Sequence, residues 1–175
     1  VYLPGNEWEN FLKDQTEKNF KGGSHLYYDG FKQQDQPFVN SECGNVWGYK
    51  GSTGDIDWSY DYHRMINSFR KFPEVAGWLY TEHHDVINEW NGYWKFDRSE
   101  KKTGLDEILE GMTLNDFHAP VYLSTGVEIC RTVNGGEKID VPLFISSFTR
   151  DDYGEDIIVE YELSHTNYIA EERLI

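Results

Sequence analysis

The sequence has no long apolar run and few cysteines. A membrane-spanning helix needs about 20 consecutive apolar residues, and neither such a stretch nor a secretory leader pattern is present. The two cysteines, Cys43 and Cys130, supply neither a disulfide framework nor the spacing of a metal site. They could pair with each other if the fold brought them together, or stay reduced. The sequence therefore indicates no membrane partner, no metal and no cofactor.

Basic residues are also scarce. Lysine and arginine number 16 against 31 aspartate and glutamate residues, which gives a net charge of -15. A nucleic-acid partner needs a basic face, so this balance argues against one. The chain begins at Val1 rather than at methionine, and we expect that its natural start is missing. The compartment stays open for that reason, with a secreted or periplasmic location favoured.

Aromatic residues, in contrast, are abundant. Six Trp, twelve Tyr and ten Phe make up 16% of the chain, more than a core of this size needs. Sugars present flat CH faces, and proteins that bind them often place exposed aromatic rings beside carboxylates and amides. An aromatic-rich core is an equally common explanation. The composition is thus compatible with a carbohydrate ligand without requiring one.

Residues 1–112 alternate helix and strand patterns. Helices are expected over 7–20, over the stretch that ends before Pro73, and over 105–112. Short buried strands are expected at Phe38-Val39, running into Glu42, and at Val75–Tyr80. A long polar loop follows each strand. The central helix has four apolar residues on one face: Trp58, Tyr62, Met65 and Phe69. This alternation is typical of an α/β fold.

Residues 113–175 follow a different pattern, in which apolar and polar residues alternate with period two. The alternation covers 126–130, 137–148 and 154–165, and the turn sequence Asn134-Gly135-Gly136 separates the first two stretches. It predicts an all-β part built as an antiparallel sandwich. About four strands are too few for a complete sandwich. Two or three parallel strands likewise cannot close a barrel, so both parts look cut from something larger.

Carboxylates follow both strands of the α/β part. Glu42 comes directly after the first strand, and Glu82 after the second. In α/β barrels the catalytic groups lie at the carboxyl ends of the strands, in the loops that follow. A structural ion pair or a loop anchor is the more common role for such a side chain. Spacing alone therefore does not assign a function to either residue.

Four segments of this region occur in an ordered set. They are Ser41-Glu42-Cys43-Gly44, Ala76-Gly-Trp-Leu-Tyr-Thr-Glu82, Asp85–Gly92 and Asp97–Lys102. The set resembles the C-terminal part of a family 2 glycoside hydrolase, the group of β-galactosidases, β-glucuronidases and β-mannosidases. In that family the seventh barrel strand ends in Ser/Thr-Glu-aromatic-Gly, and Cys43 stands here in place of the aromatic residue. The resemblance covers residues 37–112 well, and the part after 113 fits the β-sandwich domain that commonly follows the barrel.

The resemblance implies a fold and a reaction. Residues 1–112 would be the C-terminal portion of a (β/α)8 TIM barrel, and residues 113–175 the start of an immunoglobulin-like β-sandwich. Glu42 would be the nucleophile of a retaining enzyme that cleaves β-glycosidic bonds by double displacement. A nucleophilic carboxylate must be ionised, which requires hydrogen-bond donors. Asn40, Ser41 and Asn45 surround Glu42 in the sequence with such groups.

A retaining enzyme also needs a second carboxyl group, roughly 5–5.5 Å from the nucleophile, as acid and base. The family places it in an Asn-Glu pair after the fourth strand. Asn6-Glu7 is too close to Glu42 along the chain to be that pair, and it fits the start of a helix better. Asn88-Glu89 lies on the wrong side of the nucleophile. We therefore expect the acid/base to come from a missing N-terminal part of the same enzyme, and the 175 residues alone to be inactive.

The other candidate site residues would contact the sugar. They are Tyr2, Asn45, Trp47, Tyr80, Glu82, Asp85 and Trp90. The resemblance implies that a tyrosine at the end of the sixth strand hydrogen-bonds the nucleophile; Tyr2 has that place, and Tyr28 competes for it. Glu82 and Asp85 could bind sugar hydroxyls or hold the loop. A metal site at His83-His84-Asp85 is disfavoured, because adjacent residues of an extended segment point to opposite sides.

Two other functions are compatible with the sequence. A non-catalytic carbohydrate-binding module would use the aromatic loops alone, and a structural or interaction domain would have no sugar site. An Asn-Glu acid/base upstream in the full-length gene would separate the enzyme from the binding module.

Overall fold

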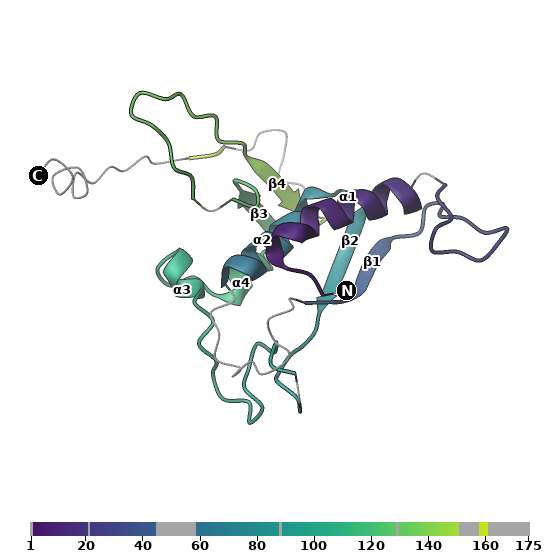
Figure 1. The fold of residues 1–175 in the computed structure, drawn as a ribbon, viewed down its shortest axis with the longest axis horizontal. Helices are drawn as coiled ribbons and strands as arrows, with labels where there is room; N and C mark the ends of the chain where they lie inside the picture. The colour runs from purple at the N-terminus through teal and green to yellow at the C-terminus, as the bar shows by residue number, and fades with distance from the viewer. Residues whose placement is uncertain are drawn as a thin grey trace, which may run out of the picture.

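A computed structural model describes residues 2–20, 22–44, 59–87, 89–128, 130–150 and 158–160 (Figure 1). In chain order the elements are η1 (Gly5–Glu7), α1 (Trp8–Asn19), β1 (Phe38–Cys43), α2 (Ser59–Lys71), β2 (Val75–Tyr80), α3 (Leu105–Ile108), α4 (Leu114–Phe117), β3 (Val121–Ser124) and β4 (Phe144–Ser147). The strands form two separate two-stranded sheets. Among these elements, no helix has the length and apolar character that would let it cross a membrane.

Strands β1 and β2 pair in parallel, and α2 is the crossover between them. The register places Phe38 opposite Val75, Asn40 opposite Trp78 and Cys43 opposite Tyr80. Parallel neighbours cannot be joined by a tight turn, so the chain must return along a helix before it re-enters the sheet. The helices predicted over 7–20 and before Pro73 and the two predicted strands are confirmed, in the order helix, strand, helix and strand. Of the helix predicted over 105–112, only Leu105–Ile108 is helical. Trp58, predicted on the buried face of the central helix, lies outside the described residues.

Helix α2 buries one face completely. Tyr62, Met65, Ile66 and Phe69 recur at the helical spacing, and each is 0% exposed. The Phe69 ring stacks on Trp78 of β2, with ring centroids 5.3 Å apart and planes 12° from parallel. It also contacts the ring of Trp8 in α1 at 5.1 Å. The core therefore lies between the sheet and the two helices that cover one of its faces.

Helix α2 also approaches η1 closely at Gly5. A Cβ on Gly5 would lie 2.5 Å from Asp61 Oδ1 and 2.8 Å from Asp61 Cα, which no side chain tolerates. The Gly5 amide donates a hydrogen bond to the same carboxylate oxygen at 3.3 Å. Glycine at this position thus lets the segment before α1 pack onto the first turn of α2.

Strands β3 and β4 pair antiparallel, from Val121 opposite Ser147 to Ser124 opposite Phe144. The strand predicted over 126–130 is wrong, because β3 ends at Ser124. Ser124 Oγ accepts a hydrogen bond from the Gly126 amide at 2.8 Å, and Gly126 has a φ of 100°, so the chain turns out of the sheet. Of the strand predicted over 137–148, only Phe144–Ser147 is strand.

The other sequence predictions for this half have different outcomes. The turn at Asn134-Gly135-Gly136 is confirmed, with the Glu137 amide donating to the Asn134 carbonyl at 3.1 Å. The strand predicted over 154–165 lies outside the described residues, except for 158–160. The barrel and the sandwich both remain predictions.

Arg70 joins the antiparallel sheet to α2. Its Nη2 donates hydrogen bonds to the carbonyls of Phe117 at 2.7 Å and Ala119 at 2.9 Å. The guanidinium also lies over the rings of Tyr122, at 4.6 Å, and Phe148, at 5.3 Å. One side chain of the crossover helix thereby contacts the chain just before β3, within β3 and just after β4.

Truncating Phe69 tests this core. Phe69→Ala should lower the free energy of unfolding by about 3–5 kcal/mol, because it removes the ring that both Trp8 and Trp78 contact and leaves a cavity. The measurement is urea denaturation followed by circular dichroism. Tyr60→Ala is the matched control on the same helix, since Tyr60 is 45% exposed. Equal losses for the two variants would contradict the packing described here.

Candidate active site at the carboxyl edge of the parallel sheet

Glu42 lies near the carboxyl end of β1, where three parallel segments meet. Tyr2 forms a parallel bridge with Gly44, and the Leu3 amide donates to the Gly44 carbonyl at 3.3 Å. On the other side, the Thr81 amide donates to the Cys43 carbonyl at 2.7 Å. Because carboxyl ends of parallel strands meet at one edge of a sheet, the residues after each strand gather around Glu42.

The Tyr2 side chain forms a hydrogen bond with the Glu42 side chain. Its hydroxyl donates to Glu42 Oε1 at 3.0 Å, and the Glu42 amide donates to Asn40 Oδ1 at 3.1 Å. The structure thus contains the hydrogen bond that the resemblance implied for Tyr2. Tyr28, the competing tyrosine, is 91% exposed in the loop before β1, at the opposite end of that strand. Glu42 is exposed.

The glycine of the Ser-Glu-Cys-Gly motif has a steric role. A Cβ on Gly44 would lie 2.9 Å from Tyr2 Cε1 and 3.1 Å from the Thr81 carbonyl oxygen. Any larger residue would push the Tyr2 ring away from the strand. Gly44 therefore permits the approach that brings the Tyr2 hydroxyl to Glu42.

Cys43 points to the other side of the strand, into the core. It is 0% exposed, and its thiol donates to the Leu79 carbonyl at 3.3 Å. Burial raises the pKa of the Cys43 thiol to about 12, and the charge of Glu42 acts in the same direction. Neighbouring residues of one strand thus face opposite environments, with Glu42 outside and Cys43 inside.

Glu82 follows β2 at the same edge, beyond a cis peptide bond with Thr81. Its Oε1 is buried and has no hydrogen-bond donor within the described part of the chain. Burial raises the pKa of the Glu82 carboxyl, and the charges of Glu89 and Asp85 add to the effect. A carboxyl group of this kind retains its proton to higher pH than usual, and it can then donate a hydrogen bond to a hydroxyl group.

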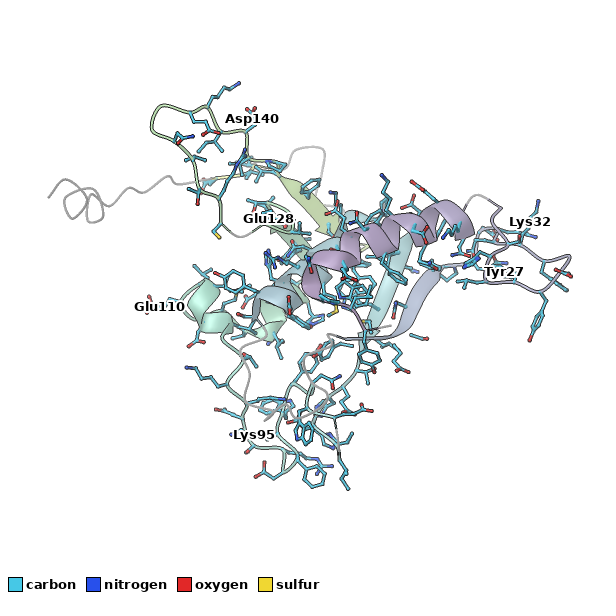
Figure 2. The ribbon with its side chains drawn as sticks, in the orientation of Figure 1. Tyr27, Lys32, Lys95, Glu110, Glu128 and Asp140 are labelled. Carbon is cyan, nitrogen blue, oxygen red and sulfur yellow. The ribbon has the colours of Figure 1, made fainter. Side chains whose placement is uncertain are left out.

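Asp85 holds the loop that follows β2. It is 2% exposed, and its Oδ1 pairs with Lys101 Nζ at 2.7 Å and accepts from the Gly92 amide at 2.9 Å. Lys101 Nζ also donates to the carbonyls of Trp90 at 2.6 Å and Gly92 at 3.2 Å. These contacts agree with the loop-holding alternative for Asp85. The contacts between Asp85 and Lys101 hold the two ends of the loop together. The loop lies below the sheet in the view of Figure 2 and carries Lys95.

Tyr80 belongs to a buried tyrosine cluster beneath this loop. Its ring stacks on Tyr93 with centroids 4.7 Å apart, and its hydroxyl donates to the Asn91 carbonyl at 2.5 Å. The Tyr62 hydroxyl bonds both Tyr93, at 2.8 Å, and His118 Nε2, at 2.7 Å. Burial raises the pKa of Tyr80 and of Tyr62 well above the ordinary value, so both stay neutral. The cluster supports the loop from the core side.

The remaining candidates are placed as follows. Trp90 is half-buried in the loop, while Asn45 and Trp47 lie outside the described residues. The rings of His83 and His84 are 5.8 Å apart and nearly perpendicular. Within the ranges given above, no group of three His, Cys, Asp or Glu side chains is arranged to hold a metal ion.

Sequence reasoning missed Lys101 and His118. Lys101 lies 16 residues after Asp85 and His118 lies 56 residues after Tyr62, so no helical or strand period links either pair. The strand ends, in contrast, were identified from local pattern. Long-range polar pairs become visible only when the fold is known.

Comparison with known proteins adds no assignment. No protein-family model matches the chain, and the search of curated proteins found no match. The function must therefore be argued from the geometry of this sheet edge.

The different environments of the two thiols can be measured. In a mildly alkaline buffer, a thiol-specific disulfide reagent should modify exposed Cys130 quickly and leave Cys43 intact, because a thiol with a pKa of about 12 forms almost no thiolate there. In a Cys130→Ser variant, the remaining thiol of Cys43 should react with the reagent only when the protein unfolds. Rapid modification of Cys43 in the folded variant would show that β1 does not pack as described.

The buried ion pair can be tested by a double-mutant cycle. Lys101→Met should lower the free energy of unfolding by about 3–5 kcal/mol, because Asp85 is left charged and unpaired in the interior. Asp85→Asn combined with Lys101→Met should cost less than the sum of the two single changes. Lys18→Met breaks the exposed pair with Asp14 and should hardly move the denaturation midpoint. Additive effects at Asp85 and Lys101 would refute their coupling.

Proposed function

We propose that Glu42 is the catalytic nucleophile of a retaining glycosidase that acts on β-linked sugars. The observation that carries the proposal is the hydrogen bond from the Tyr2 hydroxyl to Glu42 Oε1 at the carboxyl edge of the parallel strands. A donor at this distance fixes the orientation of the Glu42 carboxylate. The exposed position leaves Glu42 accessible to a substrate.

In the proposed reaction, Glu42 attacks the anomeric carbon while the bond from that carbon to the leaving oxygen breaks. A second carboxyl group, roughly 5–5.5 Å away, gives its proton to the leaving oxygen. That group then takes a proton from water, which attacks the glycosyl–enzyme ester and releases Glu42. We place this acid/base on further barrel strands, in the N-terminal part that the resemblance implies.

The open face of the sheet supports a larger barrel. Val39 of β1 is 49% exposed and Leu79 of β2 is 60% exposed, on the face that α1 and α2 leave uncovered. Parallel sheets are normally covered on both faces, because both carry apolar side chains. Additional strands that closed the sheet into a barrel would bury Val39 and Leu79 in its interior.

Glu82 and the loop after β2 fit the sugar-binding side of the site. Glu82 lies at the same edge as Glu42, and its raised pKa extends the pH range in which its carboxyl group can donate a hydrogen bond to a sugar hydroxyl. In the loop, Trp94 is 38% exposed and Phe96 is 60% exposed. Exposed rings of this kind stack on the CH faces of sugars. They would also serve a binding module without catalysis, which is the second candidate function.

Covalent trapping on the full-length product of the gene tests the nucleophile. An aryl 2-deoxy-2-fluoro-β-glycoside with a dinitrophenolate leaving group needs no acid for the first step, so the glycosyl–enzyme should accumulate. Peptide mapping by mass spectrometry should place the label on Glu42, and Glu42→Gln should remove both the label and turnover. Tyr2→Phe should lower kcat by roughly ten- to hundred-fold through loss of one charge-assisted hydrogen bond.

Glu9→Gln is the matched control, since Glu9 pairs with Lys71 on the helical side of the sheet. It should leave turnover unchanged. A label on another carboxylate, or full turnover by Glu42→Gln, would reject the proposal. Sugar binding that survives Glu42→Gln in a protein that never takes the label would favour the binding module.

A further inference from the structure

The chain contains two Asn–Gly pairs in opposite environments. Asn91-Gly92 lies in the loop after β2, and Asn134-Gly135 lies in the connection between β3 and β4. Asn91 is 0% exposed, whereas Asn134 and Gly135 are both exposed. Figure 1 shows the connection between the two strands projecting away from the rest of the molecule.

The backbone nitrogen of Gly92 donates a hydrogen bond, whereas no such bond is present for the nitrogen of Gly135 among the described residues. Gly92 N donates to Asp85 Oδ1 at 2.9 Å, and Asn91 Nδ2 donates to the Thr81 carbonyl. A Cβ on Gly92 would lie 2.3 Å from Asp85 N, so the backbone at Gly92 packs tightly against residues 84 and 85. A Cβ on Gly135 would meet nothing within 4 Å.

We infer that Asn134 is a site of spontaneous deamidation and that Asn91 is protected from it. The Gly135 nitrogen loses its proton to solvent hydroxide and attacks Asn134 Cγ. The Cγ–Nδ2 bond breaks, ammonia leaves and a five-membered succinimide forms. Water then adds to either ring carbonyl, which gives aspartate or isoaspartate at position 134. No oxidant, reductant or enzyme is needed.

The contacts of the turn determine what the change does. The Asn134 amide donates to Glu137 Oε2 at 3.0 Å, and Asn134 Nδ2 approaches the same oxygen at 3.4 Å. Deamidation removes the second donor and places a new negative charge next to the Glu137 carboxylate. Like charges at this distance repel, so the turn should loosen after conversion. Isoaspartate adds a methylene to the backbone and disturbs the turn further.

The experiment is incubation of the folded chain in mildly alkaline buffer, followed by peptide mapping with mass spectrometry. Conversion of an amide to an acid should appear in the peptide with Asn134 and be absent from the peptide with Asn91. In denaturant, both peptides should convert, which shows that the fold protects Asn91. Asp29-Gly30 can form a succinimide and isomerise in the same buffer. Isomerisation of an aspartate changes neither mass nor charge, so it does not affect the measurement of deamidation.

The Gly135→Ala variant tests the reaction in a second way. The open space at Gly135 accommodates a methyl group, and the methyl narrows the backbone conformations that bring the nitrogen to Cγ, so conversion should slow by roughly ten-fold. Equal conversion of Asn134 and Asn91 in the folded chain would overturn the inference. So would a stable Asn134 in the folded chain that converts in denaturant, or an unchanged rate in Gly135→Ala.

Discussion

The packing of α2 on the β1–β2 pair is the constraint on which the rest of the structure depends. Two parallel strands can be neighbours only if the chain between them returns along the sheet, and the returning segment must bury an apolar face to stay there. In α2 that face runs from Tyr62 to Phe69, between Trp78 on one side and Trp8 on the other. Arg70, next to Phe69 in the last turn of the same helix, contacts the antiparallel sheet at Tyr122 and Ser146. Both sheets are therefore positioned by one helix.

The candidate site follows from the backbone arrangement before any side chain is considered. Parallel pairing brings the ends of β1 and β2 to one edge, and the bridge between Tyr2 and Gly44 adds a third segment beside them. The hydrogen bond between Tyr2 and Glu42 then depends on a glycine, because only glycine lets the Tyr2 ring come this close to the strand. Loop residues beyond β2 are held separately, by the buried pair of Asp85 and Lys101.

The sequence was sufficient for some of these features and not for others, for physical reasons. Helical and parallel-strand patterns over residues 7–80 were found because a buried face imposes a period on neighbouring residues. Alternation over 137–148 misled the strand prediction. Ile139 and Val141 alternate with polar residues as in a strand, yet they are 43% and 60% exposed and lie outside β4. A strand also needs a neighbouring strand for its backbone hydrogen bonds, and the alternation does not specify one. The contact of Tyr2 with Glu42 was expected only through the family resemblance.

The two carboxyl groups at this edge of the sheet have different surroundings. Glu42 is exposed and accepts a hydrogen bond from the Tyr2 hydroxyl. Glu82 has a buried oxygen without a donor among the described residues, and burial raises its pKa, which favours the neutral acid. The charges of Glu89 and Asp85 act in the same direction as burial, whereas Lys101 opposes them. Sites that attack with one carboxyl group and donate a proton from another need different surroundings for the two groups. The exposed position of Glu42 and the buried oxygen of Glu82 are compatible with the proposed nucleophile, with the acid/base assigned to another strand.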